Sequence, residues 1–230
     1  STGSIDFDGI ETGDSVSIAS STGVFDTKNV GTGKTVTLTN TYGGTDLGNY
    51  TIIDQISTTA SISVRSVSVT PTTAQTKVYG STDPLPFTYN TETALGDRGL
   101  ISGDAFTGTL SRTVGEAVGT YSITIGTLTN TNYSIDYSSK DFSITSKTIT
   151  VTGISAADKV YDGNTTATIS TGSIIYDGLE TGDNVSIASS TGVFDTKNVG
   201  TGKTVTLTNT YVGTDVGNYT IVNQGTTTAA

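Results

Sequence analysis

The residues of this chain that could do chemistry are carboxylates. Four of them, Asp6, Asp8, Glu11 and Asp14, lie close together in the sequence. Two carboxyl groups on either side of a glycosidic bond can hydrolyse it. The same oxygens, with Gly9 at a turn, could instead bind Ca²⁺, although the spacing of a calcium loop is incomplete.

A second acidic group, formed by Asp177, Glu180 and Asp183, repeats the first, except that Ile175 replaces Asp6. Two identical active sites in one small array would be unusual, and the chain has no Trp to stack a sugar. We therefore expect no enzyme activity, no catalytic residue and no cofactor. The seven carboxylates are expected to be turn and solvated-edge residues, with a calcium site as the alternative.

The residue types that are missing exclude several classes of function. The chain has no His, Cys, Met or Trp, so zinc, copper and haem sites of the usual kinds cannot be built. Neither a Ser-His-Asp triad nor a cysteine nucleophile is possible. The net charge of −10 disfavours nucleic acid and anionic membranes as partners. No apolar run is long enough to span a membrane, so we expect no membrane insertion.

The chain contains a close internal repeat. Residues 1–55 match residues 170–224 with only 8 differences. Repeats this similar indicate recent duplication within a tandem array. Stalks, adhesins and filaments often carry such copies, whereas enzymes seldom do.

Short motifs connect the middle of the chain to both copies. They are Lys-Val-Tyr at 77–79 and 159–161, Val-Gly-Thr at 30–32, 118–120 and 199–201, and Asn-Tyr at 49–50, 132–133 and 218–219. We therefore expect three related domains, at residues 1–65, 66–146 and 147–230, called here the first, middle and last domain. The asparagines Asn49, Asn132 and Asn218 are expected to be turn residues, and the tyrosines beside them core anchors.

The local pattern indicates β-strands throughout. Val36, Leu38 and Tyr42 alternate with threonines, as in a strand with one buried and one solvated face. The chain has 50 Thr and 26 Ser, and β-branched residues disfavour helix. The predicted fold is all-β: tandem small antiparallel β-sandwich domains, Ig-like in architecture, in an elongated array.

The domain boundaries are predicted where strands continue without a flexible linker. The apolar register changes at Arg65 and Ser66, which indicates that one domain's last strand passes directly into the next domain's first. Residues 144–149 behave in the same way, so both joints should be stiff. The first domain is expected to lack its first strands and the last domain to have a truncated last strand. An arbitrary fragment boundary would explain both ends, and so would head-to-tail strand donation between chains.

Two bacterial repeat families resemble this chain. Residues 147–230 are similar to the YDG domain, and residues 1–65 to the same domain without its opening motif. The similarity lies in Lys159-Val-Tyr-Asp-Gly-Asn-Thr-Thr-Ala167, Gly182-Asp183, Phe194, Lys197-Asn-Val-Gly200, Lys203 and Gly217-Asn-Tyr219. Residues 66–146 resemble the MBG domain, a bacterial Ig-like module. Here the motifs are Lys77-Val-Tyr-Gly-Ser-Thr-Asp-Pro84, Gly103-Asp104, Leu110-Ser-Arg112, Gly115-Glu116, Gly119-Thr-Tyr121 and Asn132-Tyr133.

The resemblance implies a non-catalytic spacer in a large bacterial adhesin, extracellular and either secreted or on the cell surface. It would form a semi-rigid stalk for cell adhesion or biofilm. Expected partners are neighbouring repeats of the same polypeptide, a second copy by head-to-tail self-association, and a host or surface glycan bound by other regions. The alternatives are a self-assembling filament subunit linked by strand donation, or a module that binds carbohydrate or calcium.

Lys159 allows one further interpretation. Some surface Ig-like domains join a lysine to an asparagine by an isopeptide bond, and Asn218 could be such a partner. The favoured interpretation makes Lys159 an exposed turn cation and Asp162 a turn former. Tyr161 would then pack its ring inward and keep its hydroxyl in water.

Overall fold

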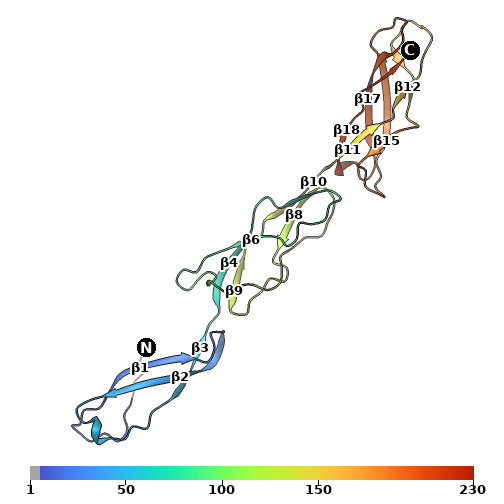
Figure 1. Cartoon of the computed structure of the whole chain (residues 1–230). Helices are drawn as coiled ribbons and strands as arrows, with labels where there is room; N and C mark the ends of the chain where they lie inside the picture. Colours follow the sequence, from blue (N-terminus) through green and yellow to red (C-terminus); the bar gives the residue numbers. More distant parts are fainter. Residues whose placement is uncertain (1–5) are drawn as a thin grey trace. The chain divides into compact units, whose positions relative to one another are not determined.

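A computed structural model describes residues 6–230 and is almost entirely β (Figure 1). The regular elements besides strands are two single 3-10 turns, η1 (Leu47–Asn49) and η2 (Val216–Asn218), within the described residues. The prediction of an all-β fold is confirmed. Over the same residues, no helix has the length and apolar character that crossing a membrane requires.

The chain divides into two compact units. The first unit contains residues up to 68 together with 91–106 and 129–136, and the second contains 69–90, 107–128 and 137–230. The middle domain thus supplies residues to both units. Each unit holds one place where the middle domain meets a flanking domain, and these two places are called the first joint and the second joint.

The first unit contains an antiparallel sheet in the order β1-β2-β3. It is formed by β1 (Ser17–Phe25), β2 (Gly31–Gly43) and β3 (Ser57–Ile62) (Figure 1). Ser63 and Val64 separate β3 from β4 (Arg65–Pro71), where the sequence predicted direct continuation. A further sheet, β6-β4-β9, includes β6 (Tyr89–Thr91) and β9 (Tyr133–Tyr137), and its residues divide between the two units.

The second unit contains four sheets. The first has the order β5-β10-β8-β7, with β5 (Thr76–Val78), β7 (Ser111–Arg112), β8 (Gly119–Thr124) and β10 (Asp141–Thr145). The others are β15-β11-β18, β12-β14 and β13-β16-β17-β19. Their strands are β11 (Lys147–Thr152), β12 (Ser155–Ala156), β13 (Thr166–Ala167), β14 (Ile169–Ser170), β15 (Ile175–Asp177), β16 (Ser186–Phe194), β17 (Lys203–Val212), β18 (Tyr219–Val222) and β19 (Thr226–Ala229).

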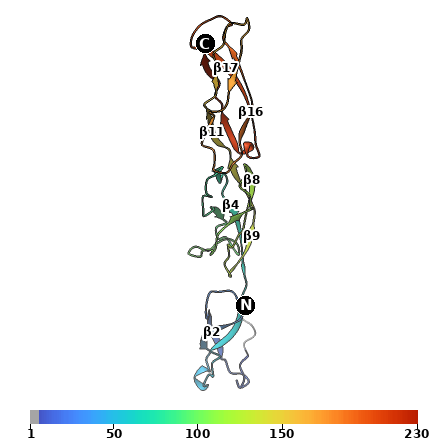
Figure 2. The same cartoon turned by 90° about the vertical axis from the view of Figure 1, so that its right-hand side faces the viewer.

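Two strand pairs correct the prediction of purely antiparallel sheets. β5 pairs with β10 in parallel, and β11 pairs with β18 in parallel. In both cases an early strand of a domain lies beside a late one, which requires the intervening chain to cross over. Only Ser146 separates β10 from β11. In both views the C-terminus and β17 lie at the end of the second unit away from β8 (Figures 1 and 2).

The core of the last domain lies between two of these sheets. Val151 of β11 and the nearby Ile154 pack against Phe194, Val205 and Leu207 of the facing sheet. Threonines alternate with the buried residues along β17 and remain in water. This arrangement is a small β-sandwich with one apolar face on each sheet.

The repeat places one sequence in two environments. β1 and β16 have identical sequences, but Phe194 is only 4% exposed, whereas its counterpart Phe25 is half-buried. The core partners Val151 and Ile154 of Phe194 precede the repeated sequence. The difference in burial therefore comes from context alone.

Shortening the two phenylalanines should reveal this difference. Phe194→Ala should lower the stability of the last domain by about 3–5 kcal/mol, because it removes a fully packed ring. Phe25→Ala should cost the first domain less than about 2 kcal/mol, since its ring is already partly in water. Hydrogen exchange of the β17 and β2 amides reports each domain separately. Equal losses in the two domains would contradict the burial described here.

Candidate functional site

Two of the acidic residues that the sequence singled out, Asp14 and Asp183, occupy matching positions. Each of them accepts a hydrogen bond from a tyrosine of its own domain. The hydroxyl of Tyr50 donates to Asp14 at 2.8 Å, and that of Tyr219 donates to Asp183. In the middle domain Tyr133 donates to Asp104 at 2.7 Å. These Asp–Tyr pairs, one per domain, join the Gly-Asp motif to the Asn-Tyr motif. The recurrence of both motifs was visible in the sequence, but their contact was not.

Each Asp–Tyr pair also fixes the loop before the aspartate. The tyrosine hydroxyl oxygen accepts a hydrogen bond from the backbone N–H of the residue three positions before the aspartate. The donors are Glu11 at 3.0 Å, Ile101 at 3.2 Å and Glu180 at 3.1 Å. A buried phenol needs such partners. Tyr133 and Tyr219 are only 7% exposed, as core anchors should be. The carboxylate is thereby held at one end of its domain.

At the first joint, the Asp–Tyr pair of the middle domain meets the first domain. The Lys28 ammonium donates to the other oxygen of Asp104 at 2.6 Å. The backbone N–H of Val30 donates to the side-chain oxygen of Asn132 at 2.9 Å, and the Asn132 amide donates to Asn29 at 3.1 Å. The hydrogen bonds from Lys28 and Tyr133 lower the pKa of Asp104, and the bond to Asp104 raises the pKa of Lys28.

The second joint repeats this pattern between the middle and last domains. The hydroxyl of Tyr79 donates to Asp183 at 2.8 Å, beside that of Tyr219. The backbone N–H of Val118 donates to the side-chain oxygen of Asn218 at 2.9 Å. The Tyr79 ring lies edge-on to Tyr219, with centroids 5.4 Å apart, and packs against a core cluster of the last domain. The carboxylate therefore accepts one hydroxyl from each side of the joint.

An ion pair and a glycine complete the second joint. The Lys147 ammonium lies 2.5 Å from a carboxylate oxygen of Glu180. Gly80 has a φ of +79°, and a Cβ added there would lie 2.2 Å from a carboxylate oxygen of Glu180. A side chain at this position would strain the backbone and would push the Glu180 side chain away, so glycine is favoured there.

The joints revise the role expected for the Asn-Tyr motifs. Asn132 and Asn218 are more than turn residues, because their side-chain oxygens accept hydrogen bonds from the preceding domain. In both joints the donor is the valine of a Val-Gly-Thr motif. The donor atom belongs to the backbone, which is why the side chains of the sequence did not reveal the contact.

The other predicted calcium ligands do not come together. Asp6, Asp8, Glu11 and Asp177 are exposed, while Glu180 and Asp183 have the lysine and tyrosine partners described above. Across residues 6–230, no three acidic side chains converge as ligands of one metal ion would. Asp14 has the Tyr50 hydroxyl as its partner.

Lys159 is half-buried where an exposed turn cation was predicted, and Tyr161 is exposed where inward packing was predicted. Lys159 donates to Asp162 at 2.9 Å and to the backbone oxygens of Asn164 and Thr166. Asn218 accepts from the middle domain instead, so the two residues of the suggested isopeptide bond have different partners. The predicted inward packing of Tyr161 is wrong, since 57% of the residue is exposed.

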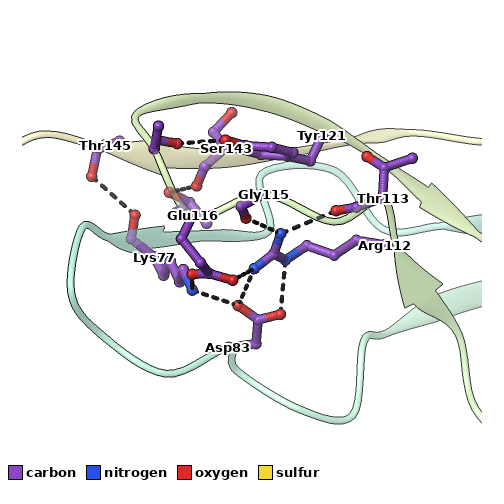
Figure 3. Close-up of polar contacts among 11 residues, drawn as sticks. Lys77, Asp83, Arg112, Thr113, Gly115, Glu116, Tyr121, Ser143 and Thr145 are labelled. Carbon is purple, nitrogen blue, oxygen red and sulfur yellow. Dashed lines mark hydrogen bonds and ion pairs between the residues drawn. The ribbon is translucent and has the colours of Figure 1, made fainter. Parts of the chain in front are cut away.

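An ion cluster with two buried cations crosses the β5-β10-β8-β7 sheet of the second unit (Figure 3). Asp83 accepts two hydrogen bonds from Arg112, at 2.8 and 3.0 Å, and lies 2.8 Å from the Lys77 ammonium. Glu116 contacts both cations. The Arg112 guanidinium also lies over the Phe142 ring, 5.3 Å from its centroid. Two positive and two negative groups thus join the two edge strands of one sheet.

Each charge in this cluster is stabilised by its neighbours. The Arg112 hydrogen bond is the main cause that lowers the pKa of Asp83, and the Lys77 hydrogen bond is the main cause for Glu116. Burial opposes the charge on Lys77, but hydrogen bonds to Asp83 and Glu116 outweigh it and raise the pKa of Lys77. Sequence analysis did not find this cluster, because its four residues are spread over 40 positions of the chain.

Comparison with known families assigns these segments. A model described as the YDG domain matches residues 1–60 and 145–229, which is more than half of the chain. The chain belongs to the YDG domain family. A model described as the MBG domain (YGX type) matches residues 67–143, between the two YDG matches. No curated protein and no solved structure matches the chain. Both kinds of domain are found in bacterial surface proteins.

One motif of the MBG match serves two structural purposes. In the segment 77–80, Lys77 belongs to the ion cluster, while Tyr79 and Gly80 belong to the joint with the following YDG match. The interior of the MBG domain and its contact with the next domain are therefore connected through four consecutive residues.

Removing one charge should show how much the ion cluster stabilises the MBG domain. Asp83→Asn leaves two buried cations with one exposed carboxylate, and should lower stability by about 3–5 kcal/mol. Glu116→Gln is the matched control and should cost less than about 1 kcal/mol, because the Glu116 side chain is 68% exposed. Urea unfolding followed by exchange of the β8 and β10 amides measures both. Similar costs for the two variants would contradict the central place of Asp83.

The second joint should loosen in strong alkali. Hydrogen bonding to Asp183 raises the pKa of Tyr79 to about 12, and burial with the same bond raises the pKa of Tyr219 to about 12. The neutral phenols are the favoured forms, so their stabilisation is complete below pH 10 and is lost as the pH rises through about 12. Tyrosinate absorbance should show tyrosines that titrate well above the ordinary pKa of 10.0, and Tyr79→Phe should remove one of the latest. Titration of every tyrosine near pH 10 would refute this assignment.

Proposed function

We propose that this chain is a spacer in a large bacterial adhesin, extracellular and either secreted or on the cell surface. In this role the YDG and MBG domains form a semi-rigid stalk that serves cell adhesion or biofilm. The observation that carries the proposal is the repetition of one joint. At both joints an asparagine oxygen accepts a valine N–H while a carboxylate accepts a donor from the preceding domain.

The energetics of the joints fit a stalk. Each neutral hydrogen bond contributes about 0.5–1.5 kcal/mol, and a bond to a charged group about 1.5–3 kcal/mol. Two such bonds are enough to favour one arrangement of neighbouring domains by roughly tenfold or more. The linking segments of one and two residues leave the domains little freedom to separate. Stiffness thus arises from several weak contacts.

The surface also fits a spacer. Ser and Thr occupy the solvated faces of the long strands, and the net charge of −10 favours solubility. In this role the partners of the chain are the neighbouring repeats of the same polypeptide. Contact with a host or surface glycan would belong to other regions of the adhesin. The spacer function requires neither a catalytic residue nor a cofactor.

One observation favours a second candidate function, that of a filament subunit linked by strand donation. Strand β13 pairs with β16 through Thr166 and Val193. At the matching edge of β1, none of the described residues forms a strand. A strand from another chain could pair there, because an open edge presents unpaired backbone groups. Light scattering over a concentration series separates this function from the spacer, because strand donation makes the particle grow with concentration, whereas a spacer keeps one size.

Spin labels can test whether the joints are stiff. Because the chain has no cysteine, pairs introduced at exposed positions can be labelled cleanly. Val114→Cys with Val193→Cys spans the second joint, and Ile53→Cys with Leu95→Cys spans the first. Narrow distance distributions are expected for the parent chain. Asn218→Ala with Tyr79→Phe should broaden only the distance distribution across the second joint. Asn132→Ala should broaden only the one across the first joint.

The parent chain and the variants together decide the outcome. Broad distributions across both joints of the parent chain would overturn the spacer proposal. Narrow distributions that the substitutions leave unchanged would show that other contacts hold the domains.

A further inference from the structure

An early and a late strand of the MBG domain lie side by side and run in the same direction. β5 pairs with β10 in parallel, with Lys77 opposite Ile144. The chain reaches β5 from the preceding domain through β4, and it leaves β10 for the next domain through Ser146 alone. Tension along the polypeptide therefore pulls on the start of β5 and on the end of β10, so that the two strands are drawn past each other along their length.

The direction of pulling decides how the hydrogen bonds between two strands break. In a parallel pair these bonds are evenly spaced along the strands. When the strands are drawn past each other from opposite ends, all of the bonds carry the load together. When the strands are pulled apart from the same end, the bonds break one after another. The parallel pair of β5 and β10 thus meets tension in the direction in which its bonds act together.

The β5–β10 pair is short, but side chains add to its backbone hydrogen bonds. The backbone N–H of Tyr79 donates to the oxygen of Thr145 at 2.8 Å, directly after β5. The hydroxyl of Thr76 donates to the backbone oxygen of Ser143 at 2.8 Å. The hydroxyl of Thr145 donates to the backbone oxygen of Lys77 at 3.2 Å (Figure 3). The two threonines thus bond the strands together in both directions.

The ion cluster holds β5 in place along the pair. Lys77 is the central residue of β5 and is only 8% exposed. Its ammonium lies 2.8 Å from a carboxylate oxygen of Asp83 and also contacts Glu116. Arg112 of β7, at the other edge of the same sheet, donates to Asp83. Sliding of β5 along β10 would separate the Lys77 ammonium from these carboxylates, and a buried charge without its partner is strongly unfavourable.

We propose that the β5–β10 pair is a mechanical clamp, a strand pair that keeps the MBG domain folded under tension, and that the Lys77–Asp83 ion pair stabilises it. The ion cluster then has a function in the stalk, which is to resist sliding of the strand that tension loads. This inference deepens the proposed spacer function and rests on it, because a stalk that anchors a cell carries tension.

Stretching single molecules in two directions tests the clamp. Because the chain has no cysteine, the full chain can carry pairs of introduced cysteines as attachment points for an optical trap. Thr73→Cys with Thr148→Cys pulls β5 and β10 from opposite ends, whereas Thr73→Cys with Lys140→Cys pulls them from the same end. All three positions are exposed. At one fixed force, unfolding from opposite ends should be at least about tenfold slower, because several bonds must break together. Equal rates would overturn the clamp.

Removing the Lys77 ammonium tests the role of the ion pair. Lys77→Met should speed unfolding from opposite ends by about tenfold, because a hydrogen bond to a charged group is lost, and should change unfolding from the same end much less. Arg98→Met is the matched control, since Arg98 forms an exposed ion pair with Glu92 in the same domain. It should change either rate by no more than about twofold. Equal acceleration by Lys77→Met in both directions would refute the role of the ion pair in the clamp.

A milder variant keeps the test decisive if Lys77→Met does not fold. Thr145→Val removes the hydroxyl that bonds to Lys77 and preserves the shape of the side chain. It should speed unfolding only from opposite ends, by roughly three- to tenfold. The same acceleration in both directions would contradict the clamp.

The clamp and the spacer function can fail separately. Equal unfolding rates in the two directions, together with narrow spin-label distances across both joints, would refute the clamp and leave the spacer function standing. Broad spin-label distances across both joints would overturn the spacer function, and with it the tension that the clamp is proposed to resist.

Discussion

The structure depends on a carboxylate that is held at the end of each domain by that domain's own tyrosine. The tyrosines of the middle and last domains are buried, and a buried hydroxyl must find an acceptor. The aspartate supplies it, and its remaining acceptor capacity faces the preceding domain. Tyr79 uses that capacity on Asp183, and Lys28 uses it on Asp104. A requirement of the domain interior thereby creates an acceptor for the neighbouring domain.

The asparagine contact explains how different domains can follow one another. The donor at each joint is a backbone N–H, which nearly every residue has. The preceding domain needs only a loop that presents this group, and the Val-Gly-Thr motif does so in both families. The following domain needs the Asn-Tyr and Gly-Asp motifs. A YDG domain can therefore follow an MBG domain through the same contacts as the reverse, while the domain interiors differ.

Sequence analysis predicted the strands and the repeat well, because the alternation along Val36 and Leu38 is a local property and the two copies align directly. Contacts between distant segments were largely missed. The pairing of β5 with β10, the ion cluster around Asp83 and the Val118 bond to Asn218 all join residues far apart in the chain. The prediction that Tyr161 packs inward was wrong for a different reason. Its Lys-Val-Tyr motif matches that of Tyr79, and Tyr79 is buried by contacts with the following domain.

The two copies show that the stability of a repeat is partly a property of its neighbours. In tandem arrays, stability is approximately a sum of the intrinsic stability of each repeat and the interface terms between adjacent ones. Phe25 and Phe194 have the same local sequence but unequal burial. The burial of each ring therefore depends on the strands around it as well as on the sequence of the repeat. Near-identical copies can also exchange strands during folding. Strands β2 and β17 have almost the same sequence, so each could pair in the sheet of the other copy. The MBG domain between the two copies has a different interior, so the neighbour of each copy has strands that do not fit its sheet.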